Sequence, residues 1–262
     1  MAFRVIVIGG VNVDIAGIPS GKLIQRDSNP GKIKLSPGGV GRNIAENLVT
    51  LGAEVSLVCA IGDDIYSSII TESCEKIGID LSLAKKVKGA GSSVYLYIAD
   101  ETGDMYAAVN DMDIVNEINP EFLSGIKFDE YDACVVDANL SRECLEFICS
   151  NVTVPLYADP VSCAKAVRLK GLHFTAIKPN LMEGEILAPF EAERVYLSLG
   201  KQGIRAISSD EDIAISPDTV LSANTNGAGD AATAAIVFAE LSGLDLEHSA
   251  RFAVKYVSEK LK

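Results

Sequence analysis

The stretch FRVIVIGGVNVD at residues 3–14 indicates which kind of fold the chain adopts. Phe3–Ile8 is a continuous, β-branched apolar run that ends in two glycines, which is typical of a strand buried on both faces. The run holds one basic residue, and polar Asn12 and Asp14 follow soon after it, so it does not resemble a secretory signal. We therefore expect a sheet covered by helices on both sides.

Further along the chain, short apolar strands alternate with helices. Arg42–Leu51 carries apolar residues at helical spacing before Gly52, and Val55–Ile61 is another buried strand, followed by a helix that ends at Ile77. The alternation continues through strands at Cys134–Asp137, Val154–Ala158, Phe174–Ile177 and Val195–Leu199, and helices at Ser141–Cys149, Val161–Leu169, Ala228–Leu241 and Glu247–Leu261. This order predicts an α/β fold with a mainly parallel central sheet and helices on both faces.

Two segments do not fit the alternation. Residues 16–34 are polar and contain prolines and glycines, and residues 92–109 hold two strand-like runs around a turn that ends in Gly103. We expect about 15–35 and 92–112 to form a small β lid inserted in one domain that spans 1–262. A surface hairpin without function is the alternative, although long excursions from compact domains are often functional.

Composition narrows the classes of function. The 262 residues, 48% of them hydrophobic, are enough for one large α/β domain. The net charge of −13 argues against general binding to nucleic acid or a membrane surface, and no apolar run approaches the roughly 20 residues that span a bilayer. Six cysteines without a C-x-x-C pair favour a reducing, cytoplasmic setting. One anionic small ligand stays compatible with this charge, because local dipoles can hold it.

The strongest chemical signal is NTNGAGD at residues 224–230, which leads directly into a helix. Its two glycines leave backbone N–H groups uncovered at the helix start, which predicts a cradle for a transferring phosphoryl group. Asp230 would lie where a carboxylate can accept a proton from an attacking hydroxyl. The alternative is that Asp230 only favours the helix dipole.

Two further stretches are candidates for a sugar site. SPGGVGRN at residues 36–43 opens a helix, where glycines allow close approach of a ligand and Asn43 could bond hydroxyls. Asp14 follows the first strand, at the edge where open α/β sheets bind ligands, and can accept bonds from two sugar hydroxyls. The alternatives are a glycine-rich turn and a turn aspartate. The sequence contains neither a Walker-type P-loop nor a G-x-G-x-x-G fingerprint after a strand.

Five motifs occur in one order along essentially the whole chain. They are G-x-x-N-x-D at 9–14, G-G-x-x-x-N at 38–43, K-P-N-x-x-E at 178–183, S-L-G-x-x-G at 198–203 and G-A-G-D at 227–230. This order resembles the ribokinase-like (PfkB) carbohydrate kinases. The resemblance implies a three-layer α/β/α fold with a β lid over the sugar, ATP with Mg²⁺ at the carboxyl edge of the sheet, and phosphoryl transfer to a sugar hydroxyl.

Within that family, three stretches are similar to pseudouridine kinases: SPGGVGRNIAENLVTLG at 36–52, AVNDMDI at 108–114 and ADPVSCAK at 158–165. This similarity implies transfer to the ribose 5′-hydroxyl of pseudouridine, which gives the 5′-phosphate. Two alternatives stay open. One is another ribose or nucleoside kinase, similar to ribokinase or adenosine kinase. The other is a non-catalytic nucleoside-binding protein on the same fold.

The resemblance also implies roles for individual residues. Asp230 would be the catalytic base, with the backbone of Gly227, Ala228 and Gly229 around the phosphoryl group. The implied acceptor site comprises Asn12, Asp14, Gly38, Gly39, Asn43, Asp137 and Lys165. The lid residues Ser93, Tyr95, Asn110 and Met112 would face the uracil ring. Tyr95 and Met112 fit the core of the lid equally well. The implied nucleotide site comprises Asn180, Ser198, Gly200 and Gly203, and Glu183 would hold Mg²⁺ through water.

The chain departs from the usual family pattern at two places, and its oligomeric state is a separate question. Asn224 stands where the family has an acidic residue, which leaves a role for a monovalent cation open. Only about a dozen residues separate Glu183 from the strand at Val195, where family members normally have one or more helices. We therefore expect a more open adenine pocket than in those relatives. The exposed lid could pair edge to edge into a homodimer.

Overall fold

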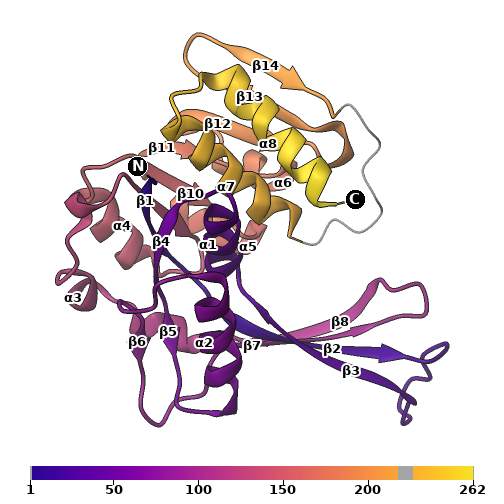
Figure 1. The fold of residues 1–262 in the computed structure, drawn as a ribbon. Helices are drawn as coiled ribbons and strands as arrows, with labels where there is room; N and C mark the ends of the chain where they lie inside the picture. The colour runs from indigo at the N-terminus through magenta and orange to yellow at the C-terminus, as the bar shows by residue number, and fades with distance from the viewer. Residues whose placement is uncertain (1, 218–226, 262) are drawn as a thin grey trace.

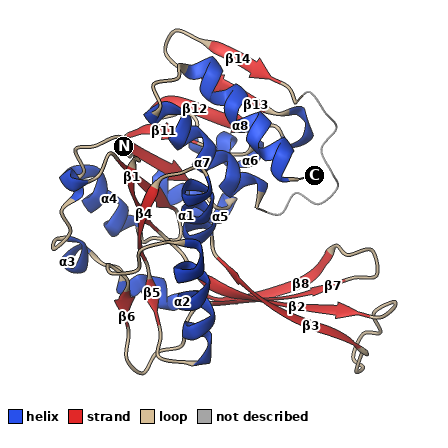
Figure 2. Cartoon of the chain, viewed as in Figure 1, coloured by secondary structure: helices blue, strands red, loops and turns tan. Residues whose placement is uncertain are grey.

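The computed structural model describes residues 2–217 and 227–261, and an eight-stranded sheet lies at its centre (Figures 1 and 2). Its strand order is β14-β13-β12-β11-β10-β9-β1-β4. The strands are β1 (Arg4–Ile8), β4 (Glu54–Val58), β9 (Ala133–Asp137), β10 (Leu156–Asp159), β11 (Phe174–Ile177), β12 (Ala192–Ser198), β13 (Ile204–Ile207) and β14 (Asp212–Ile215). The six strands from β4 to β12 in this order pair in parallel, whereas β13 and β14 pair antiparallel at one edge. The mainly parallel sheet is confirmed, and the antiparallel edge is an addition to the prediction.

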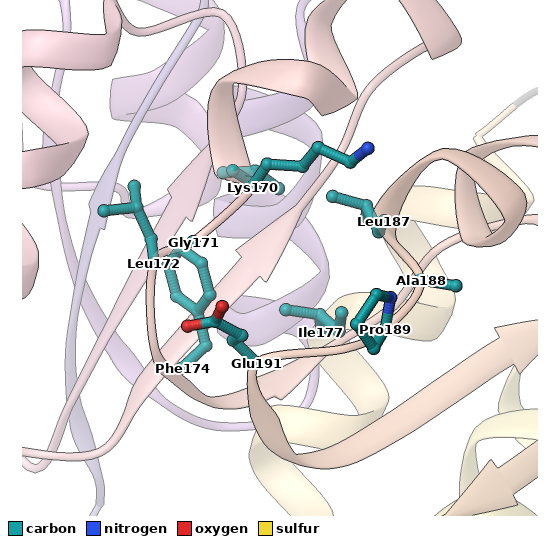
Figure 3. Close-up of a pocket in the computed structure, with 10 residues that line it drawn as sticks. Lys170, Gly171, Leu172, Phe174, Ile177, Leu187, Ala188, Pro189 and Glu191 are labelled. Atoms are coloured by element: carbon teal, nitrogen blue, oxygen red, sulfur yellow. The ribbon is translucent and has the colours of Figure 1, made fainter.

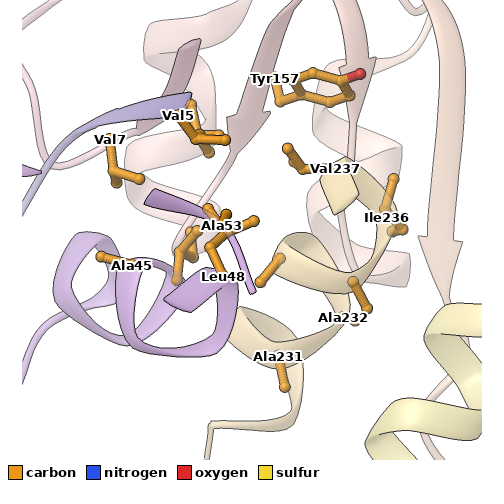
Figure 4. Close-up of a cluster of buried hydrophobic side chains, with 14 of the residues drawn as sticks. Val5, Val7, Ala45, Leu48, Ala53, Tyr157, Ala231, Ala232, Ile236 and Val237 are labelled. Carbon is orange, nitrogen blue, oxygen red and sulfur yellow. The ribbon is translucent and has the colours of Figure 1, made fainter. Parts of the chain in front are cut away.

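Helices cover both faces of the sheet. Successive side chains at residues 5–8 of β1 point to opposite sides and are all apolar, so each face needs its own cover. Val5 and Val7 pack in one core with α1 (Val40–Thr50) and α7 (Ala228–Leu241) (Figure 4). The same core includes side chains of α2 (Ile65–Ile77) and α8 (Leu246–Lys260). Ile6 and Ile8 pack in a second core with α3 (Pro120–Leu123), α4 (Arg142–Asn151), α5 (Cys163–Ala166) and α6 (Leu181–Leu187). The predicted three-layer α/β/α arrangement is therefore confirmed.

A second sheet, the lid, projects from the body (Figure 1). Its order is β3-β2-β7-β8, with β2 (Asn12–Pro19), β3 (Gly31–Gly38), β7 (Val94–Ala99) and β8 (Met105–Asp111). The lid was predicted, but its first strand begins at Asn12 rather than near residue 15. Residues 36–38 belong to β3 rather than to a loop before the helix, because they pair with residues 12–14 of β2.

Two predicted elements differ from the structure. The strand expected at Val55–Ile61 ends at Val58, because the chain then forms β5 (Ala60–Ile61), which pairs with β6 (Lys85–Lys86) in a separate small sheet. The helix expected at Val161–Leu169 is divided into α5 and a 3-10 turn at Val167–Leu169. In the part of the chain that the structure describes, no helix has the length and apolar character needed to cross a bilayer.

Candidate active site

The acceptor side of the site is built where β2 and β3 meet the body. A Cβ atom added to Gly38 would lie 2.3 Å from Asp14 Oδ2, so the backbone of Gly38 lies directly against this carboxylate. Asn12 Nδ2 donates to Asp14 Oδ1 at 2.6 Å. Burial raises the pKa of Asp14, and the Asn12 hydrogen bond opposes that rise. Gly39 has a φ of 102°, and a Cβ there would lie 2.5 Å from a backbone carbonyl oxygen before β2, so only glycine fits.

A chain of polar contacts joins this side to the predicted base. Asn43 Nδ2 donates to Asp230 Oδ2 at 2.9 Å, across 187 residues of sequence. The buried Arg42 donates to Asn43 Oδ1 at 3.1 Å and forms an ion pair with Glu46 at 2.7 Å. Arg42 thus fixes which way the Asn43 amide points, because its guanidinium can only donate. The structure brings Asn43 and Asp230 together as the motifs implied.

Asp230 has the electrostatic surroundings of a general base. Burial raises the pKa of its carboxyl group to about 7, and the negative charge of Asp159 adds to this rise. The hydrogen bond from Asn43 and the positive charge of Lys178 oppose it. A carboxylate that titrates near neutral pH can accept a proton from a hydroxyl and remain ionised in a useful fraction of molecules.

The start of α7 provides uncovered backbone donors beside Asp230. Gly227 caps the helix in the left-handed conformation, with a φ of 74°, and makes no side-chain capping bond. The first N–H groups of a helix have no partner within the helix, and here they belong to 228–230. They can therefore bind an anion such as a phosphoryl group, as the sequence implied for Gly227, Ala228 and Gly229. Asn224, whose family counterpart is acidic, lies outside the described residues.

A pocket of about 260 Å³ opens at this helix start. All four residues predicted for the nucleotide line it, namely Asn180, Ser198, Gly200 and Gly203. The same pocket is lined by Ala228 and Gly229 of the cradle, and by apolar Ile204, Val254, Val257 and Leu261. Backbone N–H groups at a helix start and an apolar surface thus meet in one pocket, which we call the donor pocket because the predicted nucleotide residues line it.

Glu183, the residue predicted for Mg²⁺, caps a helix together with Asn180. Asn180 Oδ1 accepts from the Glu183 backbone N–H at 3.0 Å, and Glu183 Oε2 accepts from the Asn180 N–H at 2.9 Å. This capping box leaves one carboxylate oxygen of the buried Glu183 outside the pair of bonds. Burial raises the pKa of Glu183, opposed by the Asn180 bond and the charge of Lys178. Among the residues that the structure describes, no three His, Cys, Asp or Glu side chains form a metal cluster.

A polar pocket of about 400 Å³ lies on the lid side of the sheet edge. We call it the base pocket, after the nucleobase of the acceptor that the sequence implies. It is lined by Asn110, Asp111, Met112, Asp113, Asn116, Asn139, Lys165 and Arg168. Lys165 Nζ donates to Asn139 Oδ1, and a Cβ on Gly10 would lie 2.8 Å from Asn139 Nδ2 and 3.4 Å from Met112 Cε. The predicted residues Met112, Asn110 and Lys165 therefore lie together, close to the β1–β2 connection that carries the acceptor side.

Asp137 does not fit the direct substrate contact that we expected of it. The residue is fully buried, and its two carboxylate oxygens accept from the backbone N–H groups of Gly10 and Asn139, at 2.8 and 2.9 Å. Burial raises the pKa of Asp137 to about 6. Asp137 thus holds the chain around the pocket, and Asn139, two residues later, lines the pocket in its place.

Strand register places the predicted lid residues on one face. Asp14 pairs with Ser36 and Tyr95, and Tyr95 pairs with Asn110, so these side chains share a face of the lid. Two residues before Tyr95 on the same side, Ser93 is 1% exposed. Its Oγ is the buried side-chain oxygen that has no hydrogen-bond partner among residues 2–217 and 227–261. An unsatisfied buried hydroxyl is unfavourable, which makes Ser93 a candidate ligand contact.

Another pocket, of about 190 Å³, lies away from these residues (Figure 3). It is lined by residues of β11, the end of α6 and the loops beside them, with Lys170 and Glu191 among mostly apolar side chains such as Leu172, Leu187 and Pro189. None of the predicted site residues lines it. We therefore expect the chemistry at the donor pocket, the base pocket and the start of α7, where the predicted residues lie.

Sequence reasoning missed several residues that the structure places in the site. Asn139 and Arg168 line the base pocket, and Arg42 orients Asn43. Lys178 and Asp159 form a buried ion pair with 3.1 Å between Nζ and Oδ2. Both lie inside stretches already quoted, K-P-N-x-x-E and ADPVSCAK, so the signal was present without a role attached to it.

Comparisons with known proteins show which family the chain belongs to. The model of the pfkB family carbohydrate kinases matches residues 2–260. A pseudouridine kinase of Escherichia coli K12 is 36% identical, over 95% of this chain and 87% of its own. A carbohydrate kinase from Agrobacterium tumefaciens superposes with a TM-score of 0.85 at 24% identity, over 98% of this chain and 90% of its own. An Arabidopsis thaliana ribokinase complexed with ribose and ATP superposes at 0.79 and 19% identity, over 100% and 93%. The chain therefore belongs to the pfkB family of carbohydrate kinases.

Proposed function

We propose that this kinase uses ATP to phosphorylate the ribose 5′-hydroxyl of a nucleoside, and that its preferred acceptor is pseudouridine. The observation that carries the proposal is the position of Asp230. Its carboxylate contacts Asn43 on the acceptor side, and the preceding residue, Gly229, lines the donor pocket. The similarity to a relative named pseudouridine kinase supports the choice of acceptor.

In the proposed reaction, Asp230 accepts the proton of the 5′-hydroxyl as the bond from O5′ to the γ-phosphorus forms. The bond from the γ-phosphorus to the β,γ-bridging oxygen breaks, and ADP leaves. The backbone N–H groups at the start of α7 would stabilise the charge on the transferring group. Asp14 and Asn43 would hold ribose hydroxyls, so that O5′ lies near the Asp230 carboxylate.

Mg²⁺ is expected to bind mainly to ATP phosphates and water. The free carboxylate oxygen of Glu183 would hold one of those waters, which fits a protein site with few direct ligands. When bound, the ion would neutralise charge on the β- and γ-phosphates. Glu183 and Asn180 lie on the same helix start, so their capping box keeps this oxygen and the donor pocket in a fixed relation.

The base pocket is the proposed location of the uracil ring. Its amides, Asn110 and Asn139, can both donate and accept, and Lys165 supplies a donor for a carbonyl oxygen. Uracil linked through carbon has two ring N–H groups and two carbonyl oxygens, so it needs donors and acceptors together. A polar pocket of this volume suits such a ring better than a free pentose, which would leave the pocket unfilled.

The proposal is tested by measuring ADP release with a panel of pseudouridine, uridine, adenosine, inosine and ribose. We expect the highest kcat/KM for pseudouridine. If the protein phosphorylates ribose or adenosine but not pseudouridine, it is a kinase and the proposed acceptor is wrong. Measurable nucleoside binding without turnover of any acceptor would instead favour the non-catalytic binding protein.

The lid offers a sharper test through two adjacent serines. Ser93→Ala is expected to raise the KM for the nucleoside by about tenfold, because one hydrogen bond to the ligand is lost. The same change should leave the melting temperature unchanged or higher, because it removes an unsatisfied buried hydroxyl. Ser92→Ala is the matched control, since Ser92 Oγ bonds Asp64 and accepts from the Gly62 N–H. It should lower the melting temperature instead, and an unchanged KM in Ser93→Ala would contradict the assignment.

We also propose that two copies of the chain pair through the lid, by face rather than by edge. The face opposite Asp14 carries Ile33, Leu35, Leu96, Ile98 and Val109, all exposed. Neither of the two rows of the sheet that hold them includes a charged residue. In a chain of net charge −13, this uncharged face is where a second copy meets the least repulsion.

The pairing is tested by the mass in solution. Wild-type protein is expected to have the mass of a dimer by light scattering, and Val109→Glu the mass of a monomer, because Val109 is 71% exposed on this face. Val167→Glu is the matched control, since Val167 is 52% exposed on the body and should leave the dimer intact. A wild-type monomer at micromolar concentration would overturn the proposal.

A cytoplasmic location is part of the proposal. All six cysteines are free thiols, and Cys59, Cys74, Cys134 and Cys144 are buried among apolar side chains. Free thiols of this kind are typical of proteins kept in a reducing compartment. Fractionation of cells that produce the full chain would test the location directly.

A further inference from the structure

A buried ammonium group lies beneath the start of α7. Lys178 directly follows β11, is 7% exposed, and forms its ion pair with Asp159 at the end of β10. A Cβ atom added to Gly229 would lie 3.1 Å from Lys178 Nζ. The ammonium group therefore lies against the first turn of α7, beside the N–H groups that form the phosphoryl cradle.

The Asp159 carboxylate is fully engaged, so it holds the lysine in place. Asp159 Oδ2 accepts from Thr233 Oγ1 at 2.7 Å in addition to Lys178, and Oδ1 accepts from the Val161 N–H at 2.9 Å. Asp159 is 3% exposed. Thr233 lies one turn after Gly229, and its hydroxyl also contacts the Gly229 carbonyl oxygen at 3.3 Å. The carboxylate thus connects Lys178 to α7.

The ammonium group has more donors than this pair uses. Lys178 Nζ carries three N–H bonds, and Asp159 is its one partner within the described residues. Burial alone would lower the pKa of Lys178, but the charges of Asp159 and Asp230 outweigh burial and raise it, so the group stays positive. A buried cation with unused donors is costly unless something else satisfies it. Its neighbours, Gly229 and Asn180, both line the donor pocket.

We infer that Lys178 is a catalytic residue that donates a hydrogen bond to a non-bridging oxygen of the γ-phosphoryl group during transfer. This inference rests on the proposed kinase function. The γ-phosphoryl group gains charge on its equatorial oxygens in the transition state, and a fixed ammonium group beside the cradle stabilises that charge without reorganisation. Glycine at position 229 leaves this ammonium group its room, because a Cβ atom there would lie in tight contact with Nζ.

The first experiment compares Lys178→Met with the double variant Lys178→Met/Asp159→Asn in the full chain. We expect kcat to fall by 10²–10³ in Lys178→Met, with the Kd for the nucleoside changed less than threefold. The single change leaves Asp159 buried and unpaired, which also lowers the melting temperature. The double variant removes both charges and should recover the melting temperature while kcat stays low. Recovery of kcat with stability would show a purely structural role and overturn the inference.

A binding measurement separates this inference from the proposed function. ADP with aluminium fluoride mimics a phosphoryl group in transfer and needs no turnover, so it can be titrated by calorimetry even if no acceptor on the panel reacts. We expect wild-type protein to bind it with Mg²⁺ at least 30-fold more tightly than Lys178→Met does, with similar affinities for ADP alone. Lys255→Met, which removes one charge from the exposed side of α8, should match the wild type. Equal binding by Lys178→Met and the wild type would overturn the role of Lys178, whatever the acceptor.

Discussion

Replacing Asp230 by asparagine is expected to lower kcat by about 10³, because the proposed base can no longer accept the proton of the 5′-hydroxyl. Asparagine keeps the shape of the side chain, so the contact with Asn43 can be retained and nucleoside binding should change little. The measurement is ADP release at saturating substrates together with a nucleoside Kd. Asp129→Asn, an exposed position on a 3-10 turn, is the control and should match the wild type.

The pH profile of the wild type should identify the same group. Since burial raises the pKa of Asp230 to about 7, the carboxylate form is lost as the pH falls through 7. We expect log kcat/KM to decrease with a slope of one below about pH 7 and to be flat above it. The residual activity of Asp230→Asn should not show this limb. A wild-type profile that is flat from pH 5.5 to 8 would contradict the assignment of Asp230 as base.

The raised pKa of Asp230 also has a consequence for stability. The pKa of an aspartate in the unfolded chain is about 4, so the folded protein binds the proton more tightly than the unfolded chain does. The free energy of unfolding therefore decreases as the pH rises from about 4 to about 7, and Asp230→Asn removes this loss. We expect Asp230→Asn to melt at a higher temperature than the wild type at pH 8, although it is nearly inactive.

The second large effect is expected from Gly38→Ala. The new methyl group would lie 2.3 Å from Asp14 Oδ2, so the carboxylate must rotate away from the position in which it would hold the ribose hydroxyls. Hydrogen bonds to a charged group contribute about 1.5–3 kcal/mol each, so the loss of one or two predicts a nucleoside KM raised by about 10². Steady-state kinetics with each substrate varied in turn would show this rise, with the KM for ATP nearly unchanged.

Gly17→Ala supplies the matched control for Gly38→Ala. Gly17 lies on the same lid, but a Cβ there would have its nearest neighbours at 3.7 Å, which is ordinary contact. Both substitutions lower the freedom of the unfolded chain in the same way. A similar KM in the two variants would mean that the Asp14 carboxylate does not hold the acceptor.

Local patterns in the sequence were enough to predict the layers of the fold. The β-branched run at Phe3–Ile8 and the run of small residues at Ala228–Leu241 each depend on residues close in sequence, and α7 has the predicted bounds. The antiparallel strands β13 and β14 were missed, because each has only four residues, so the alternation between buried and exposed positions is too short to stand out in the sequence. The strand β2 was misplaced at its start, because Asn12 and Asp14 resemble a loop until β3 and β7 pair with them.

The candidate site was predictable as a set of motifs but not as a set of contacts. Order along the chain brought Asn43 and Asp230 into one hypothesis, whereas their hydrogen bond joins residues 187 positions apart. Asp137 was expected at a substrate because it ends a strand, yet its carboxylate is used by two backbone N–H groups. The roles of Lys178 and Ser93 depend on which partners surround a buried polar atom, and a sequence pattern does not record this.

On the strands of the lid, neighbouring residues lie on opposite faces, so acceptor binding and assembly would constrain alternating positions. Residues 14 and 16 of β2 lie on the face that we expect to bind the acceptor, whereas residues 15 and 17 lie on the face that we expect a second copy to cover, and β3, β7 and β8 alternate in the same way. A mutational scan of these strands should therefore show a period of two, with acceptor choice and assembly affected at alternating positions. During evolution such a chain could change its nucleoside preference without changing its oligomeric state, because the residues for the two properties alternate along each strand.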